Sequence, residues 1–127
     1  MKSTAATVIS AAAAMLIFSA SLFAHHSASL YDRDHPVTVI GVVTEYRFLN
    51  PHVQIYFEAK GEDGTPEKWL AESGPPQRLF RAGWNAKSLK VGDKISVKGF
   101  PVKDGRKILS IVNLTGEHLP ALTEGAD

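Results

Sequence analysis

The sequence predicts an all-β domain with one short helix, and three observations support that prediction. An apolar, β-branched run from Val37 to Glu58 breaks only at Asn50-Pro51-His52, which is typical of two strands joined by a corner. The pairs Asp63-Gly64 and Asp104-Gly105 are typical of tight hairpin turns. The 127 residues contain no cysteine, so a domain of about 100 residues must be held by burial alone. A closed or nearly closed barrel meets that requirement best.

Residues 1–24 predict a secretory signal peptide. Met1-Lys2 gives a positively charged start, residues 11–23 are mainly apolar, and Ala24 is the small residue that a signal peptidase requires. The alternative, a retained membrane anchor, needs roughly 20 apolar residues, which is more than this run offers. We therefore expect a periplasmic protein without a stable membrane span, cleaved after Ala24 or, as a second option, after Ala20.

The charge balance of the expected mature chain bears on its partners. Lys and Arg number 14 and Asp and Glu 13, and the signal removes Lys2 and no acid, so the mature net charge is zero. Nucleic-acid binders usually show a clustered basic excess. The sequence thus predicts that nucleic acid is not a partner.

The rest of the chain predicts an irregular arm over residues 25–36, a barrel over residues 37–115 and a tail over residues 116–127. Gly41 lies inside a long first strand, which predicts a bulge or a close backbone approach where this strand bends to serve two halves of one barrel. In the second strand, Val53, Ile55 and Phe57 share the face that we expect in the core. The strands expected from β-branched content and alternation are residues 37–48, 52–58, 67–73, 94–100 and 106–114.

A short helix is predicted between Pro75 and Gly83, because proline suits a first helical turn and glycine the position after a helix. We expect it to bury Leu79 or Phe80 together with Trp84. Three strands, a short helix and a two-stranded hairpin follow one another in the order of a small five-stranded OB-like barrel. An open β-sandwich fragment and an SH3-like barrel are the alternatives.

Several motifs together resemble a family of small exported bacterial proteins that is known as a domain of unknown function. The resemblance would cover nearly all of the mature chain. It implies an exported protein with a small β-barrel domain, and it brings no established activity, ligand or catalytic residue. The motifs are His25-His26-Ser27, Gly41-Val42-Val43, Asn50-Pro51-His52-Val53, Gly83-Trp84, Leu89-Lys90-Val91-Gly92-Asp93 and Asp104-Gly105.

The histidines suggest a metal site. If the signal is cut before His25, the new α-amino group and the His25 imidazole can chelate one metal ion, with His26 beside them. Such nitrogen ligands suit copper and zinc, and their affinity order peaks at Cu(II). His52 is the natural further ligand and His35 the second, since an extended arm is long enough to fold back toward the corner. Cleavage after Ala20 would remove the amine ligand.

The same histidines also have structural interpretations. A His-His start can be a solvated terminus, and His52 can donate a ring hydrogen bond to a loop carbonyl and so order the corner. His35 and His118 can be exposed loop residues. Both interpretations of His52 stay open.

A second candidate site is the barrel face, because OB barrels commonly bind extended ligands across strands two and three with aromatic platforms. Tyr56 and Trp69 are expected on that face and Trp84 at its rim. The alternative is that these tryptophans belong to the core.

No nucleophile elbow, phosphate loop, zinc-protease helix or metal cysteine set is present in the sequence. Glu58 and Glu72 are expected to approach each other across strands two and three, but paired carboxylates without a pocket favour a solvated face over a hydrolase. Copper-dependent oxidation is the one enzymatic option. The sequence thus predicts a periplasmic binding protein of unknown role, with copper or another divalent metal as first candidate ligand and a peptide, glycan or partner protein as second.

Overall fold

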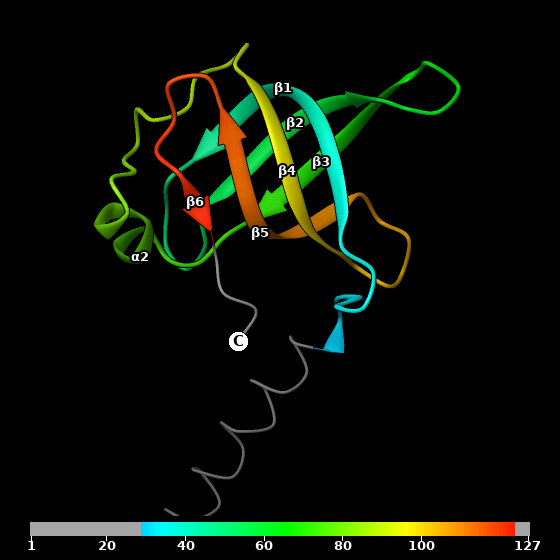
Figure 1. Cartoon of the computed structure of the whole chain (residues 1–127), viewed down its shortest axis with the longest axis horizontal. Helices are drawn as coiled ribbons and strands as arrows, with labels where there is room; N and C mark the ends of the chain where they lie inside the picture. The colour runs from blue at the N-terminus through cyan, green and yellow to red at the C-terminus, as the bar shows by residue number, and fades with distance from the viewer. Residues whose placement is uncertain (1–28, 124–127) are drawn as a thin grey trace, which may run out of the picture. The chain divides into compact units, whose positions relative to one another are not determined.

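The computed structural model describes residues 29–123. The chain divides into two compact units, Met1–Leu30 and Tyr31–Asp127, and the described strands all lie in the second (Figure 1). They form one sheet in the order β3-β2-β1-β4-β5-β6. The elements are β1 (Val37–Arg47), β2 (Gln54–Lys60), β3 (Pro66–Glu72), α2 (Pro76–Arg81), β4 (Lys94–Pro101), β5 (Ile108–Gly116) and β6 (Leu122–Thr123).

The sheet closes on itself between β3 and β5. These two strands pair in parallel, with Leu70 opposite Ile108, Ala71 opposite Leu109 and Glu72 opposite Ser110. The remaining barrel neighbours are antiparallel. The result is a five-stranded OB-like barrel with one short helix between β3 and β4, as the sequence predicts.

β1 serves both halves of the barrel. Its residues 37–42 pair with β4, whereas its residues 41–47 pair with β2. At Gly41, where the two pairings overlap, a Cβ atom would collide with the carbonyl oxygen of Glu58 and the ring of Phe57. The close backbone approach expected at Gly41 is therefore confirmed, and the bulge lies two residues further on, between Val43 and Glu45.

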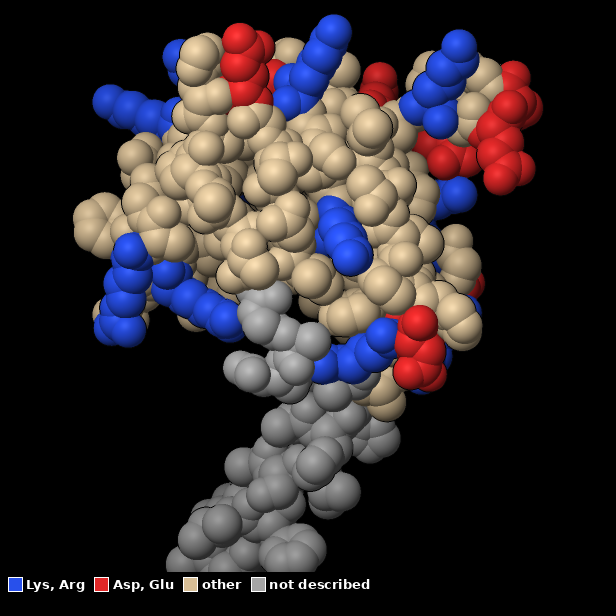
Figure 2. Space-filling model, viewed as in Figure 1, with Lys and Arg blue, Asp and Glu red and all other residues tan. Residues whose placement is uncertain are grey.

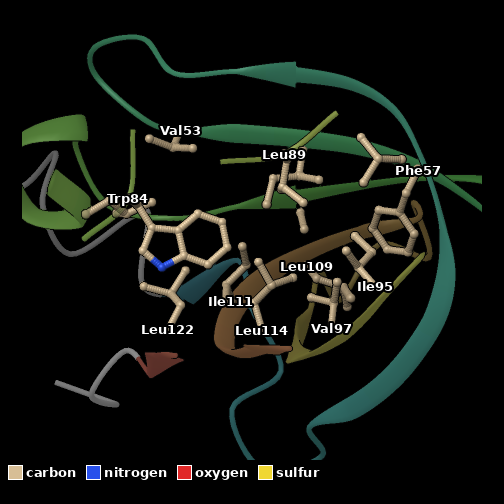
Figure 3. Packing of buried hydrophobic residues seen from close by; sticks show 14 of the residues in the cluster. Val53, Phe57, Trp84, Leu89, Ile95, Val97, Leu109, Ile111, Leu114 and Leu122 are labelled. Carbon is tan, nitrogen blue, oxygen red and sulfur yellow. The ribbon is translucent and has the colours of Figure 1, made fainter. Parts of the chain in front are cut away.

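The core fills the barrel and continues under α2. Val53, Ile55 and Phe57 are buried as the alternation predicts. Leu79 is the helix residue that is buried, while Phe80 is 68% exposed. Figure 3 shows the Trp84 ring among the buried aliphatic side chains, close to Leu122 and Ile111. Trp84 is 0% exposed, and its Nε1 has no hydrogen-bond partner within the described residues.

The end of the chain contributes more than the frayed tail expected for residues 116–127. Leu122 pairs with Leu114 as part of β6, and its side chain is buried. The ordered barrel therefore extends to at least Thr123, because the apolar side chains of Leu119 and Leu122, both beyond β5, pack on the core. Within residues 29–123, no helix has the length and apolar character needed to cross a membrane.

Candidate functional site

The outer surface of β2 and β3 is polar because of the alternation of these strands. Ile55 and Phe57 point into the core, so Gln54 and Tyr56 between and beside them point outward. Gln54 is the register partner of both Arg47 on β1 and Glu72 on β3. Three neighbouring strands therefore place polar side chains at one level of the outer surface.

These side chains form a continuous series of hydrogen bonds. Arg47 Nη1 donates to the Tyr56 hydroxyl at 3.4 Å, and the Arg47 guanidinium carbon lies 4.9 Å from the centroid of the Tyr56 ring. The Tyr56 hydroxyl donates to Gln54 Oε1 at 3.4 Å. Gln54 Nε2 in turn donates to Glu72 Oε1 at 2.9 Å. The surface thus presents its donors and acceptors in a fixed arrangement.

The segment before β1 extends this series. Tyr31 forms an isolated bridge with Val102, and the backbone N–H of Asp32 donates to the carbonyl of Pro101 at 2.8 Å. The Tyr31 hydroxyl then donates to Glu72 Oε2 at 3.4 Å. Burial, followed by the charge of Glu72, raises the pKa of Tyr31, which keeps this hydroxyl a donor at neutral pH. We refer to Tyr31, Arg47, Gln54, Tyr56 and Glu72 as the polar face.

Two loops flank the polar face. The corner between β1 and β2 leads directly into Gln54 and exposes 62% of Leu49. The loop between β4 and β5 leads into Ile108 and carries an ion pair of 2.7 Å between Arg106 and Asp104. The corner meets the face where β2 begins, at Gln54 opposite Glu72, and the β4–β5 loop ends where β5 begins, at Ile108 opposite Leu70.

Trp69 lies on the opposite side of the sheet from Tyr56. The register pairs Trp69 with buried Phe57 and pairs Tyr56 with Leu70, so Trp69 points inward near one end of the barrel. Its ring stacks on Phe57 with centroids 6.4 Å apart, and its Nε1 donates to Glu67 Oε2 at 3.3 Å. Lys107 Nζ lies 5.1 Å from the Trp69 ring centroid.

The three aromatic residues expected on one barrel face therefore lie in three different places. Tyr56 is on the outer surface, Trp69 is at a barrel end, and Trp84 is in the core rather than at a rim. Sequence reasoning did not identify Arg47 as a partner of Tyr56, or Tyr31 and Glu72 as further members of the same series of hydrogen bonds. The alternation that places Gln54 beside Tyr56 on the outward side was the signal available for this face.

Glu58 and Glu72 do not face each other. The register places Glu58 opposite Lys68 and Glu72 opposite Gln54. Four positions along β2 separate these two levels, a distance of about 13 Å at the usual rise of a strand. The expected approach of the two carboxylates is therefore wrong, because it assumed a register that the hairpin does not adopt.

The histidines expected to bind metal divide into two groups. His25 and His26 lie outside the described residues, so their metal-binding role stays a prediction. His35 Nδ1 is 3.0 Å from Asp32 Oδ2, and this contact lowers the pKa of Asp32. His52 Nδ1 donates to the carbonyl of Ser73 at 3.2 Å, which confirms that it can order the corner. Within residues 29–123, no three His, Cys, Asp or Glu side chains gather as a metal ion would require.

Comparison with solved structures finds the barrel in proteins of very different sequence. The mitochondrial single-stranded DNA-binding protein Rim1 of S. cerevisiae is 10% identical, with 72% of this chain and 96% of that chain covered at a TM-score of 0.49. A small single-stranded DNA-binding protein from Streptomyces coelicolor is 19% identical, with 65% and 92% covered at a TM-score of 0.47.

The expectation that nucleic acid is excluded as a partner does not hold; both of these similar structures are of single-stranded DNA-binding proteins. That expectation rested on net charge, which sums over the whole surface, whereas binding depends on the charges of one face. A near-balanced net charge therefore excludes no ligand class.

No match is found among curated proteins. A family model matches residues 12–109, which is most of the chain. The chain belongs to the family of unknown function DUF6152.

Proposed function

We propose that this protein is an exported binding module of the cell envelope, whose polar face holds a segment of a polyhydroxylated polymer such as a glycan. The observation that carries the proposal is the series of four hydrogen bonds from Arg47 through Tyr56 and Gln54 to Glu72 and Tyr31. The apolar run of residues 11–23 supports export.

The chemistry of the face suits sugar hydroxyl groups, which both donate and accept hydrogen bonds. The Gln54 amide offers both functions, the Glu72 carboxylate accepts, and the Arg47 guanidinium donates. Since these side chains already restrain one another, a ligand meets groups that have little freedom left to lose. Preorganisation of this kind favours binding of a ligand through many individually weak contacts.

The charges of the face suit an uncharged polymer. Arg47 Nε forms an ion pair of 2.6 Å with Glu45 Oε1. Glu72 accepts hydrogen bonds from Gln54 and Tyr31 instead of from a basic group. A neutral glycan adds no further charge to a face whose Glu72 carboxylate is already held by neutral donors.

The test is calorimetric titration of the protein with soluble, uncharged cell-wall glycan oligomers that lack peptide stems. Gln54→Leu, which keeps the size of the side chain and removes its amide, should weaken binding by about tenfold, as expected for loss of one or two hydrogen bonds. Lys98→Gln on β4 is the matched control and should leave affinity unchanged.

A single-stranded oligonucleotide is titrated in parallel. Binding of the oligonucleotide alone, weakened by Gln54→Leu, would assign the polar face to nucleic acid and overturn the glycan proposal. Equal affinity of Gln54→Leu and wild type for the uncharged glycan oligomers would overturn it as well.

A further inference from the structure

The first half of β1 has one edge that no other described strand covers. Pairing between β1 and β2 starts at Gly41 opposite Ala59, and beyond this point β1 and the β2–β3 hairpin diverge (Figure 1). Residues 37–40 pair with β4 on their other side. The splayed strands thus leave an open strand edge within a closed barrel.

The hydrogen-bonding direction of this edge follows from Val43. Its N–H donates to the carbonyl of Asp93 and its carbonyl accepts from Gly92, both on the β4 side. Because successive residues of a strand direct these groups to opposite sides, Thr38 and Ile40 direct their N–H and C=O groups away from β4. The pairing of β1 with β2 begins at Gly41, so neither Thr38 nor Ile40 has a register partner on β2 among the described residues.

A cleft of about 1060 Å³ lies against the open edge. We call it the edge cleft; its walls are Val37–Ile40 of β1 and the turn between β2 and β3, with Trp69 and Lys107 also lining it. Its volume is at the upper end of the roughly 300–1,000 Å³ of ligand clefts. The open edge therefore faces a space large enough for an extended segment.

We propose that the edge cleft binds an extended peptide, which adds a strand to β1 beside Thr38 and Ile40. Backbone N–H and C=O groups that repeat every second residue, at about 6.8 Å, are matched by another polypeptide in extended conformation. Neither a sugar chain nor a nucleic acid backbone repeats a donor and an acceptor in this way. The backbone of β1 therefore selects the class of ligand.

The side chains around the edge cleft narrow that class further. Alternate residues of an added strand point to the same side as Val39 and Trp69, which are partly buried and pack on the core, so apolar residues suit these positions. The turn that borders the cleft exposes the carboxylates of Glu62 and Asp63. Figure 2 shows acidic side chains together with basic ones on this projecting turn.

Lys107 adds little positive charge to the cleft, because its Nζ lies 3.3 Å from Glu67 Oε1. The exposed carboxylates of Glu62 and Asp63 outnumber the one remaining cation among the described residues that line the cleft, Lys60, which favours a peptide that places a basic side chain near the turn. The expected ligand alternates apolar and basic residues. This site is independent of the polar face, because Trp69 and Tyr56 point to opposite sides of the sheet.

The probe is a synthetic peptide of alternating valine and lysine, added to the purified protein at about 1 mM, the weak end of the affinity scale. Amide hydrogen exchange is followed by nuclear magnetic resonance. The exchange of Thr38 and Ile40 should slow by at least about twofold, the slowing expected when half of the protein is occupied, since both N–H groups gain acceptors. The amide of Lys103, in the loop after β4, should be unaffected. Unchanged exchange at both Thr38 and Ile40 would overturn the proposal.

N-methylation of the probe tests the backbone directly without altering the protein. Methyl groups on the peptide nitrogens that face β1 should weaken binding by about tenfold, whereas methyl groups on the alternate nitrogens should not. Equal weakening by both patterns would contradict strand addition.

A protein variant completes the test. Ile40→Pro removes the N–H that faces the cleft, and the hydrogen bonds between β1 and β4 remain. Proline is tolerated at such an edge. Ile40→Val keeps that N–H and is the matched control. Should Ile40→Pro fail to fold, the N-methylated probes still decide. The amides of Thr38 and Ile40 could also be protected without peptide, with exchange that becomes slower as the protein concentration rises. That result would show that a second copy of this chain occupies the edge and would overturn the peptide proposal.

Discussion

Gln54 and Glu72 face each other across β2 and β3, and the hydrogen bond of 2.9 Å from Gln54 Nε2 to Glu72 Oε1 is the shortest of the four in the polar face. The second oxygen of Glu72 accepts from Tyr31. One carboxylate therefore ties β2 and the segment before β1 to the end of β3. Substitution of Glu72 should therefore loosen both β2 and the segment before β1.

Alkaline pH should destabilise the barrel. Burial raises the pKa of Tyr46, and burial followed by the charge of Glu72 raises that of Tyr31. A tyrosine of the unfolded chain loses its proton at about pH 10. Above that pH the unfolded state binds fewer protons than the folded state, so the free energy of unfolding falls as pH rises. Urea denaturation at a series of pH values measures this fall.

The Glu72→Gln variant separates the two tyrosines. Loss of the negative charge should lower the pKa of Tyr31, while that of Tyr46 should not change. Titration of the assigned tyrosine ring resonances measures both values. An unaltered Tyr31 titration would contradict its contact with Glu72.

Gly41→Ala should destabilise the protein by about 2 to 3 kcal/mol, the cost of forcing a methyl group into a filled space. The reason is that the added Cβ meets the Glu58 carbonyl oxygen and the Phe57 ring. Gly92→Ala is the comparison, since Gly92 has a φ of +96° and no atom within 4 Å of an added Cβ. It should cost only about 1 to 2 kcal/mol from its left-handed backbone. Denaturant unfolding measures both, and a smaller loss for Gly41→Ala than for Gly92→Ala would contradict the close approach.

Leu122→Ala should cost about 2 to 3 kcal/mol, because it leaves a cavity beside Trp84 in the core. Thr123→Ala is the matched control on the same strand, where the exposed residue loses one hydrogen bond, to Asn113. Its cost should be about 0.5 kcal/mol. If the two variants unfold at the same denaturant concentration, β6 does not contribute to the core.

Copper binding is expected if the exported chain begins at His25. Mass spectrometry of the protein from the cell envelope should find that residue at the amino terminus, and a start elsewhere removes the amine ligand. Titration with Cu(II) should show binding that the double variant His25→Ala, His26→Ala loses and that His118→Ala keeps. Binding should weaken as pH falls below about 6.5, because protons then compete for the imidazole nitrogens.

The alternation of the sequence predicts which side chains of one strand share a side, and this was sufficient for the core positions Val53, Ile55 and Phe57. It does not predict how two strands are set against each other. That register decides that Trp69 follows Phe57 inward while Tyr56 stays outside. Because the sequence does not predict this register, Glu58 was expected to face Glu72. A hairpin turn can be closed in more than one register.

Short or irregular elements were harder to predict for a different reason. β6 contains two residues, too few to show a period, and is held by contacts with β5 that are distant in sequence. Trp84 follows α2 in a loop, where composition alone does not distinguish a rim from a core position. Burial in both cases depends on the closed barrel around them.

The barrel is closed by the three residue pairs between β3 and β5, and Glu72, opposite Ser110, is at one end of this pairing. A ligand that binds Glu72 on the outer surface would therefore also stabilise the pairing of β3 with β5. Ligand binding at Glu72 should therefore also raise the resistance of the barrel to unfolding, and a melting experiment can serve as a binding assay for this protein.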